Sequence, residues 1–250
     1  MKKIKHTILS ISALLLFVAT SMQAQDQMYW VHVDHVKPAM QGEYEKVAKA
    51  FADACKTNNL QDFEFNTWRQ GNGSYVSSSP IKNFADMDKE TMKTLSDKMG
   101  KEKFQAMFDG FDKCYDKHNS FIATYKSELS YIPTGKLAEG NFTKYHFFYV
   151  TPSNSKAVAA KLKEIKELFA KKGAKEYYVI LHSGFGASEE FYVAIVDAKD
   201  QMDYEKTSIE NDKIMGEDWG KKWGELYALL HRYETETAMY RSDLSYKATK

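Results

Sequence analysis

Tyr125-Lys126-Ser127-Glu128-Leu129-Ser130-Tyr131 returns 115 residues later as Tyr240-Arg241-Ser242-Asp243-Leu244-Ser245-Tyr246. Five of the seven positions are identical, and the other two keep their charge. Self-similarity at a fixed period is the mark of a repeated structural unit. The sequence therefore predicts a tandem duplication that covers most of the chain. Weaker matches support it at similar offsets: Asp97-Lys98 with Asp212-Lys213, Met99-Gly100 with Met215-Gly216, Phe104 with Trp219, and Pro38 with Pro152.

The N-terminus has the pattern of a secretory signal peptide. Lys2, Lys3 and Lys5 precede an apolar run at 8–19, and Ala24 offers a small residue at a cleavage site. The run is too short to span a bilayer, and no later segment approaches the roughly 20 apolar residues that a spanning helix needs. We therefore expect a signal peptide at 1–24 and a secreted or periplasmic protein without a transmembrane segment.

The charge balance argues against nucleic acid as a partner. The chain has 35 Lys and Arg, 34 Asp and Glu, and a net charge of +1. Removal of the three lysines of the signal peptide would leave a net charge of −2. A protein that binds a phosphate backbone carries a basic patch or stripe, for which this composition gives no indication.

The two cysteines, Cys55 and Cys114, both lie on the apolar faces of predicted helices. In an oxidising compartment an even number of cysteines favours a disulfide. Two buried free thiols are the alternative, because the sequence does not give the Cα separation that decides between them.

Each predicted unit has the order β-α-β-β-α-β, which is the split β-α-β, ferredoxin-like motif. The fold class is α+β, with a first unit at 25–132, a linker at 133–140 and a second unit at 141–250. In the first unit we expect strands at 29–36, 62–69, 74–79 and 125–131 and helices at 41–57, 88–99 and 101–119. In the second we expect strands at 145–150, 176–182, 191–196 and 238–246 and helices at 155–172, 204–215 and 217–232.

Val36-Lys37-Pro38 followed by Gly42-Glu43-Tyr44-Glu45-Lys46-Val47, in this order of elements, resembles the dimeric α+β barrel superfamily. That superfamily includes NIPSNAP-like and antibiotic-biosynthesis-monooxygenase-like proteins. The resemblance implies two ferredoxin-like units packed sheet to sheet as a pseudo-dimeric barrel, with the helices outside and both units in one chain. The superfamily spans cofactor-free monooxygenases, haem proteins and domains of unknown role, so the resemblance implies fold more closely than function.

Side chains of a strand alternate between its two faces, so the duplicated strands can be sorted into registers. We expect the register that is apolar in both units, such as Val31 with Tyr145, to pack under the helices. The other register would face the barrel interior, either filling it or holding a ligand. It supplies the candidate ligand-binding residues His32, Asp34, Glu64, Asn66, Trp68, Tyr75, His146, Phe148, Tyr178, His182 and Tyr192.

None of these residues belongs to a recognisable catalytic or metal-binding motif. His32 and His35 are three residues apart on a predicted strand, so they point to opposite faces and predict no chelate. Gly184-Phe185-Gly186 lies between two predicted strands, which indicates a hairpin turn rather than a nucleotide-binding loop. We predict no metal site, and the sequence identifies no cofactor.

Three functions from different classes remain. The favoured one is an exported protein that binds a small, partly apolar molecule in the barrel interior. The second is a cofactor-free monooxygenase-like or haem-dependent enzyme, with His32 and Asp34, or His146 and His182, as acid and base or axial ligand. The third is a non-catalytic interaction module of the envelope. The sequence leaves open whether the protein is an enzyme, and it does not give the oligomeric state.

Overall fold

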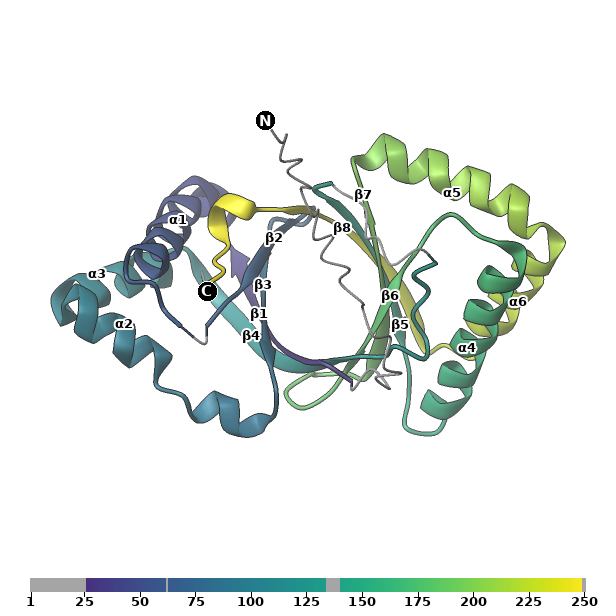
Figure 1. The fold of residues 1–250 in the computed structure, drawn as a ribbon, viewed down its shortest axis with the longest axis horizontal. Coiled ribbons are helices and arrows are strands. Elements are labelled where there is room, and N and C mark those ends of the chain that lie inside the picture. The colour runs from purple at the N-terminus through teal and green to yellow at the C-terminus, as the bar shows by residue number, and fades with distance from the viewer. Residues whose placement is uncertain (1–25, 62, 134–139, 249–250) are drawn as a thin grey trace, which may run out of the picture.

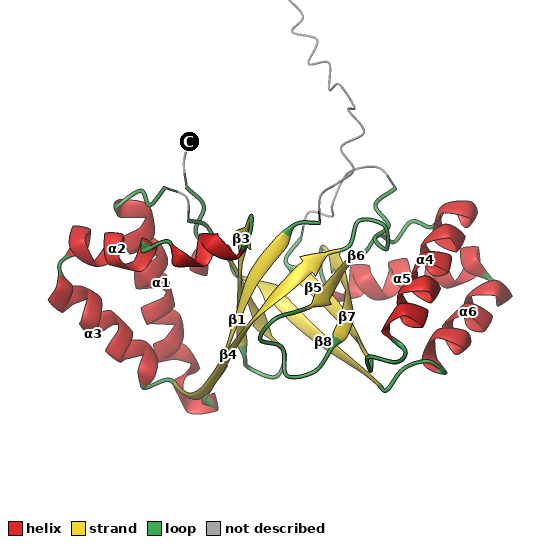
Figure 2. Ribbon diagram, turned by 90° about the horizontal axis from the view of Figure 1, so that it is seen from below, coloured by secondary structure: helices red, strands yellow, loops and turns green. Residues whose placement is uncertain are grey.

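In the computed structural model, which describes residues 26–61, 63–133 and 140–248, eight strands close into one antiparallel barrel. The helices lie outside the barrel in two groups on opposite sides (Figure 1). The same two groups flank the yellow strands in Figure 2. The predicted α+β class and the predicted barrel are therefore confirmed. The signal peptide at 1–24 and most of the linker at 133–140 fall outside the described residues.

The two halves of the chain have the same order of elements. The first half comprises β1 (Met28–Val36), α1 (Gln41–Thr57), β2 (Asn66–Gln70), β3 (Tyr75–Ile81), α2 (Thr91–Met99), α3 (Lys101–Asp112) and β4 (Tyr115–Tyr125). The second comprises β5 (Phe142–Tyr149), α4 (Ser155–Lys172), β6 (Val179–Ser183), β7 (Phe191–Ala198), α5 (Gln201–Met215), α6 (Glu217–Tyr227) and β8 (Arg232–Tyr240). Short 3-10 helices lie at η1 (Pro38–Met40), η2 (Phe84–Asp88) and η3 (Ser242–Leu244).

The strand order around the barrel is β1-β3-β2-β8-β5-β7-β6-β4. In each half the first strand pairs with the third and the fourth, and the second pairs with the third. The halves are joined where β2 pairs with β8 and β4 pairs with β6. The shared topology agrees with a duplication, which itself remains a prediction.

The first helix of each half follows its predicted bounds because its apolar residues recur at helical spacing. Tyr44, Ala48, Ala52 and Cys55 are buried along α1, and the buried face of α4 runs from Val158 to Phe169. The end of α4 is also fixed locally, because the next residue is a glycine in the left-handed conformation, with φ of 66°. These two helices lie against opposite sides of the barrel (Figure 1).

The last strand of each half is not where the sequence predicted it. The prediction placed strands at 125–131 and 238–246, whereas β4 ends at Tyr125 and β8 ends at Tyr240. The residues 115–119, predicted as the end of a helix, belong to β4 and pair with β1. This segment is polar, so its strand conformation comes from long-range pairing rather than from its own sequence pattern.

The repeated heptads, instead of forming strands, cross from one half to the other. Ser130 accepts a hydrogen bond from the backbone N–H of Ile180 at 2.8 Å. Ser245 accepts one from Thr67 at 2.9 Å. At the end of each heptad the tyrosine forms an isolated bridge with the opposite half, Tyr131 with Tyr178 and Tyr246 with Phe65. Each heptad therefore makes the same contacts with the opposite half, and this shared role accounts for the similarity of the two heptad sequences.

Cys55 and Cys114 are free thiols that are fully buried in two separate core clusters. Of the two alternatives that the sequence left open, the structure shows the free thiols. None of the helices among the described residues combines the length and the apolarity needed to cross a membrane.

The predicted assignment of strand faces is wrong for β1, β3, β5, β6 and β7 and right for β2. Val31, Val33, Tyr145 and Phe147, expected under the helices, line the barrel interior. The reason is that the barrel interior is itself lined mainly by apolar side chains, so an apolar register does not identify the helix side. The helix-facing side instead carries His32, Asp34, Tyr75, His146, Phe148, Tyr178, His182 and Tyr192.

Candidate functional site

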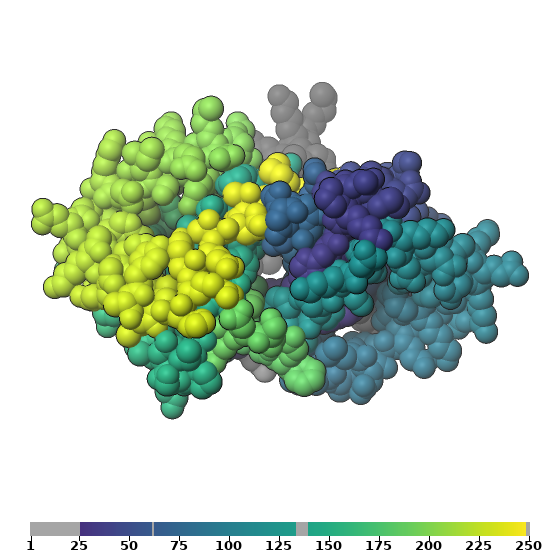
Figure 3. Space-filling model, turned by 180° about the vertical axis from the view of Figure 1, so that it is seen from behind, coloured from purple at the N-terminus to yellow at the C-terminus, as the bar shows by residue number. Residues whose placement is uncertain are grey.

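The interior of the barrel contains a cavity of about 620 Å³. Two of the candidate residues, Asn66 and Trp68, line it, and a third, Glu64, interacts electrostatically with the lining residue Tyr29. The face seen in Figure 3 is hollowed between the two halves of the molecule. The side chains of the described residues therefore do not fill the interior, contrary to the alternative of a filled barrel. This barrel cavity is lined mainly by aromatic and aliphatic residues, among them Tyr29, Phe121, Phe147, Tyr149, Phe191 and Val193.

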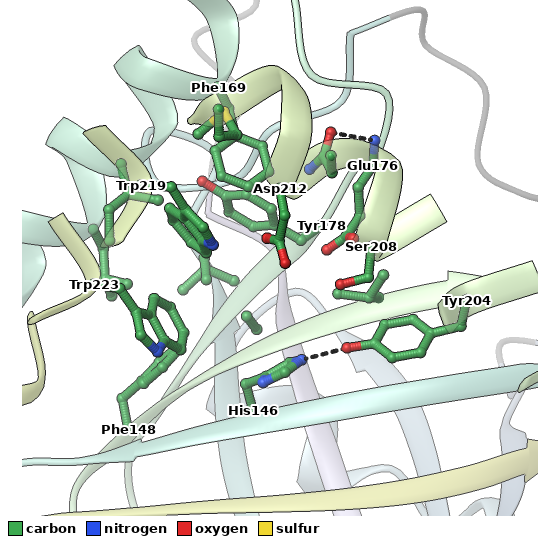
Figure 4. Close-up of a pocket in the computed structure, with 17 residues that line it drawn as sticks. His146, Phe148, Phe169, Glu176, Tyr178, Tyr204, Ser208, Asp212, Trp219 and Trp223 are labelled. Atoms are coloured by element: carbon green, nitrogen blue, oxygen red, sulfur yellow. Dashed lines mark hydrogen bonds between the residues drawn. The ribbon is translucent and has the colours of Figure 1, made fainter. Parts of the chain in front are cut away.

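A second cavity of about 240 Å³ lies in the second half, between the sheet and the helices α4, α5 and α6. We call it the helix–sheet pocket (Figure 4). Three of the candidate residues meet here, and the rest of the wall comes from residues that the sequence did not single out. Its lining is His146, Phe148, Leu162, Ile165, Phe169, Glu176, Tyr178, Ile180, Ala194, Val196, Tyr204, Ser208, Asn211, Asp212, Met215, Trp219 and Trp223.

Aromatic rings form one side of the helix–sheet pocket. The ring centroids of Trp219 and Trp223 are 5.0 Å apart, because one turn of α6 separates the two residues. Phe169 of α4 lies edge-on to Trp219 at 5.4 Å, and Phe148 of β5 lies edge-on to Trp223 at 5.8 Å. Such rings offer flat apolar surface against which another ring can stack.

Oxygen atoms from two carboxyl groups and a hydroxyl form the other side. Glu176, Asp212 and Ser208 extend into the same space (Figure 4). Glu176 as a residue is half-buried, but its carboxyl group lies inside the pocket. Burial, and then the charge of Asp212, raises the pKa of Glu176 to about 7. Glu176 can therefore hold or release a proton near neutral pH.

His146 is held between two tyrosine hydroxyls. Its Nδ1 lies 2.6 Å from the hydroxyl of Tyr233, and its Nε2 lies 3.2 Å from that of Tyr204. Burial, with a smaller contribution from Lys144, lowers the pKa of His146 to about 4. The imidazole is therefore neutral at pH 7, so one ring nitrogen donates a hydrogen bond and the other accepts one.

The hydroxyl of Tyr178 has no hydrogen-bond partner among the described residues, although it is buried. The ring reaches across the pocket towards Phe169 and Trp219 (Figure 4). Buried polar groups are nearly always paired, with protein or with bound water. A buried hydroxyl without a partner, on a residue that lines a cavity, indicates a candidate place for a ligand or a water molecule.

The remaining candidates lie apart from both cavities. His32 and Asp34 are hydrogen-bonded to each other in the first half, at 3.0 Å. His182 is bonded to Glu190 at 2.9 Å and stacks on the ring of Tyr192. The hydroxyl of Tyr75 donates to Glu45 at 2.6 Å. The structure therefore does not bring His146 and His182 together as one catalytic pair.

The helix–sheet pocket does not fit a haem with His146 as the axial ligand. Both ring nitrogens of His146 already meet tyrosine hydroxyls, so iron ligation would displace one of these bonds. No other histidine is among the residues that line this pocket. His35, which lines the barrel cavity, likewise has both nitrogens engaged, with Asn119 and Ser74.

Only the comparison with solved structures places the chain among known proteins, and it does so by fold alone. No protein-family model matches the sequence, and comparison with curated proteins finds no match either. Among solved structures, an anthrone oxidase-like protein superimposes with a TM-score of 0.60 and 12% identity over 90% of this chain and 94% of that one. A protein from Lactobacillus acidophilus NCFM that is proposed to be a monooxygenase gives a TM-score of 0.54 and 8% identity over 90% and 97%.

A chlorite dismutase from Candidatus Nitrospira defluvii is also similar, with a TM-score of 0.51 and 8% identity over 88% of this chain and 93% of that one. Because these identities are so low, the likeness shows the fold and does not transfer an activity. It confirms that the chain has the architecture of the dimeric α+β barrel proteins. Any chemistry has to be argued from the cavities themselves.

Proposed function

We propose that this protein binds a small, planar aromatic molecule with a polar substituent, such as a ring hydroxyl, in the helix–sheet pocket. The observation that carries this is the buried hydroxyl of Tyr178, which has no partner among the described residues and lies at a cavity walled by aromatic rings. An unsatisfied buried hydroxyl costs about 1–3 kcal/mol. A polar group on the ligand would remove that cost, while the ring would fill the space beside Trp219.

The size of the pocket supports a ligand of one or two rings. A dry protein cavity of about 150 Å³ is large enough to bind benzene. The helix–sheet pocket, at about 240 Å³, has room for a second fused ring or for substituents. Phe148 and Trp223 offer edges and faces at the distances at which aromatic pairs attract one another.

Glu176 supplies the chemistry that we assign to this site. With a pKa of about 7, its carboxyl group can take a proton from a ring hydroxyl that is placed beside it. A deprotonated ring is electron-rich and is more readily oxidised. This is the part that the protein would play in a cofactor-free, monooxygenase-like reaction, the enzyme class implied by the resemblance. Of the similar structures, one is named anthrone oxidase-like and another is proposed to be a monooxygenase.

A second candidate site is the barrel cavity, which agrees with the sequence-based hypothesis of a ligand in the barrel interior. Its volume of about 620 Å³ lies within the range of small-molecule sites, and its lining is mainly apolar with a few polar groups such as Asn66 and Asp197. We rank it second because the structure gives it no unpaired buried polar atom among the described residues.

We further infer that the protein is exported and that its halves arose by duplication. The pattern at 1–24 supports export, and the shared topology and the repeated heptads support duplication. Mass spectrometry of the mature protein from its native host tests the first point, because cleavage after Ala24 gives a chain that begins at Gln25.

The binding site is tested by calorimetric titration of the mature chain with 1-naphthol as a probe. We expect saturable binding that is weakened in Tyr178→Phe and in Glu176→Gln. The matched control is Leu181→Trp, which adds bulk to the barrel cavity and leaves the helix–sheet pocket unchanged. Binding that is lost only in Leu181→Trp would assign the ligand to the barrel. If no member of a panel of one- and two-ring phenols binds, the proposal is wrong and the interaction-module hypothesis gains support.

A further inference from the structure

We propose that His32, Asp34 and His118 form a binding site for a divalent transition-metal cation such as Zn²⁺. This inference concerns the first half of the chain and is independent of the function proposed for the second half. Each of the three residues offers a ligand atom, and these atoms all lie within 4.8 Å of one another. Two imidazoles and one carboxylate are a common ligand set for zinc and for divalent iron.

The register of two strands brings the three residues together. His32 and Asp34 are two residues apart on β1, so their side chains share a face. Asp34 lies directly opposite His118 of β4, and His32 lies opposite Ser120. Opposite residues of an antiparallel pair have neighbouring side chains. The rings of His32 and His118 are accordingly 5.3 Å apart, edge to face.

The distance between the two innermost ligand atoms suits a shared metal ion. His32 Nε2 and Asp34 Oδ1 are 3.0 Å apart. Two ligand atoms that are each about 2.1 Å from a tetrahedral ion lie about 3.4 Å apart, a few tenths of an ångström farther than these two atoms. An ion can therefore replace the hydrogen bond between these two atoms, both on side chains of β1, after a small rotation of the side chains. His118, which is exposed, closes the site from the solvent side.

The other atom of each inner ligand is already held. Asp34 is only 5% exposed, and its Oδ2 accepts a hydrogen bond from the hydroxyl of Tyr44 at 2.7 Å. His32 Nδ1 lies 2.7 Å from the hydroxyl of Ser120. A ligating histidine usually donates its second N–H to a neighbour, and a ligating carboxylate is usually hydrogen-bonded in turn. With metal on Nε2, the proton of His32 resides on Nδ1 and is donated to Ser120.

The corresponding place in the second half shows what the same strand pairing does without these ligands. There His146 lies opposite Thr235, and Phe148 lies opposite Tyr233. A phenyl ring thus replaces the carboxylate and a phenol replaces the second imidazole. The second half therefore has an aromatic pocket at the place where the first half has a set of metal ligands. The equivalent strand pairs, β1 with β4 and β5 with β8, thus support two different kinds of site.

No metal site was expected from the sequence, because His32 and His35 point to opposite faces of a strand. His118 was assigned to the end of a helix, so its place on β4 opposite Asp34 was hidden. Two candidate ligands alone, His32 and Asp34, gave no reason to expect a metal site. The third ligand becomes visible only with the pairing of β1 and β4.

The test is calorimetric titration of the mature chain with ZnCl₂, together with the visible absorption spectrum of bound Co²⁺. We expect one saturable site per chain and Co²⁺ bands of low-symmetry coordination. His118→Ala should bind at least tenfold more weakly. Tyr44→Phe, which alters a positioning residue, should bind about tenfold more weakly while keeping the Co²⁺ bands. The matched control is His231→Gln, which removes an exposed histidine elsewhere and should bind as the wild type does.

His118 carries the decisive substitution because it is exposed and its removal leaves the buried Asp34–Tyr44 pair in place. Weaker binding in His118→Ala together with unchanged binding in His231→Gln supports the site. The proposal is overturned if the wild type takes up neither ion in a saturable way, if His118→Ala binds as tightly as the wild type, or if His231→Gln weakens binding equally.

Discussion

Replacing Tyr178 with phenylalanine should make the folded protein more stable and make its ligand bind more weakly. The substitution removes one hydroxyl oxygen and keeps the ring that packs edge-on against Phe169 at 5.2 Å. Because the hydroxyl has no partner among the described residues, its removal breaks no protein hydrogen bond. Opposite effects on stability and binding are what we expect of a group that serves a ligand.

The magnitude follows from the cost of a buried polar group without a partner, about 1–3 kcal/mol. Taking the lower end, we expect the free energy of unfolding of Tyr178→Phe to rise by about 1 kcal/mol. For a chain of this size, that corresponds to a rise in Tm of about 2–4 °C. Loss of one hydrogen bond to the ligand should weaken the binding of 1-naphthol by about tenfold.

Tyr131→Phe is the matched control. Tyr131 forms the isolated bridge with Tyr178, is buried to a similar extent, and packs on the same Phe169. Its hydroxyl, unlike that of Tyr178, donates a hydrogen bond to the carbonyl of Ala174 at 3.0 Å. Removing it should lower the free energy of unfolding by about 1 kcal/mol. Both variants are measured by urea unfolding and by calorimetric titration with 1-naphthol.

The reasoning would be refuted if Tyr178→Phe lost as much stability as Tyr131→Phe. That result would mean that the Tyr178 hydroxyl already makes a hydrogen bond in the folded protein without a ligand. A Tyr178→Phe variant that bound 1-naphthol as tightly as the wild type would equally contradict the proposed role.

Three further predictions concern titration, the heptads and the thiols. Burial raises the pKa of Glu176 from 4.5 to about 7, so its contribution to stability is fully present below pH 4.5 and is lost as the pH rises through 7. In urea unfolding, the free energy of unfolding of the wild type, relative to that of Glu176→Gln, should fall by at most about 3 kcal/mol between pH 4.5 and pH 8. A difference between the two proteins that stays constant with pH would contradict this. Ser130→Ala leaves the N–H of Ile180 without its acceptor and should lower the free energy of unfolding by about 2 kcal/mol. The expected fall in Tm is about 4–8 °C, and an unchanged Tm would show that this heptad does not stabilise the contact between the halves. Cys55 and Cys114 are both 0% exposed, so a thiol reagent should label neither in the native protein and both in denaturant; labelling of one thiol in the native state would contradict their burial.

The sequence predicted most of the architecture because the architecture follows from local signals. The apolar residues at helical spacing predicted the bounds of α1 and α4. The repeated heptads gave two equivalent halves. Their conformation was predicted wrongly, because Ser130 and Ser245 bind to strands that are distant in sequence.

The candidate site could be predicted only in part, because it depends on which face of each strand meets the helices. His146, Phe148 and Tyr178 were identified as candidates but were placed in the barrel interior. Glu176 was missed, since a carboxylate next to a strand has no distinguishing pattern in sequence. Its raised pKa arises from burial and from Asp212, a residue on another element, and only the folded structure brings these together.

The most direct test of the central claim is a crystal structure of the mature protein with 1-naphthol bound. We predict density for the ring system in the helix–sheet pocket, stacked beside Trp219, with the naphthol oxygen within hydrogen-bonding distance of Tyr178 or Glu176. Density confined to the barrel cavity, or an unoccupied pocket under conditions in which calorimetry shows saturation, would contradict the account.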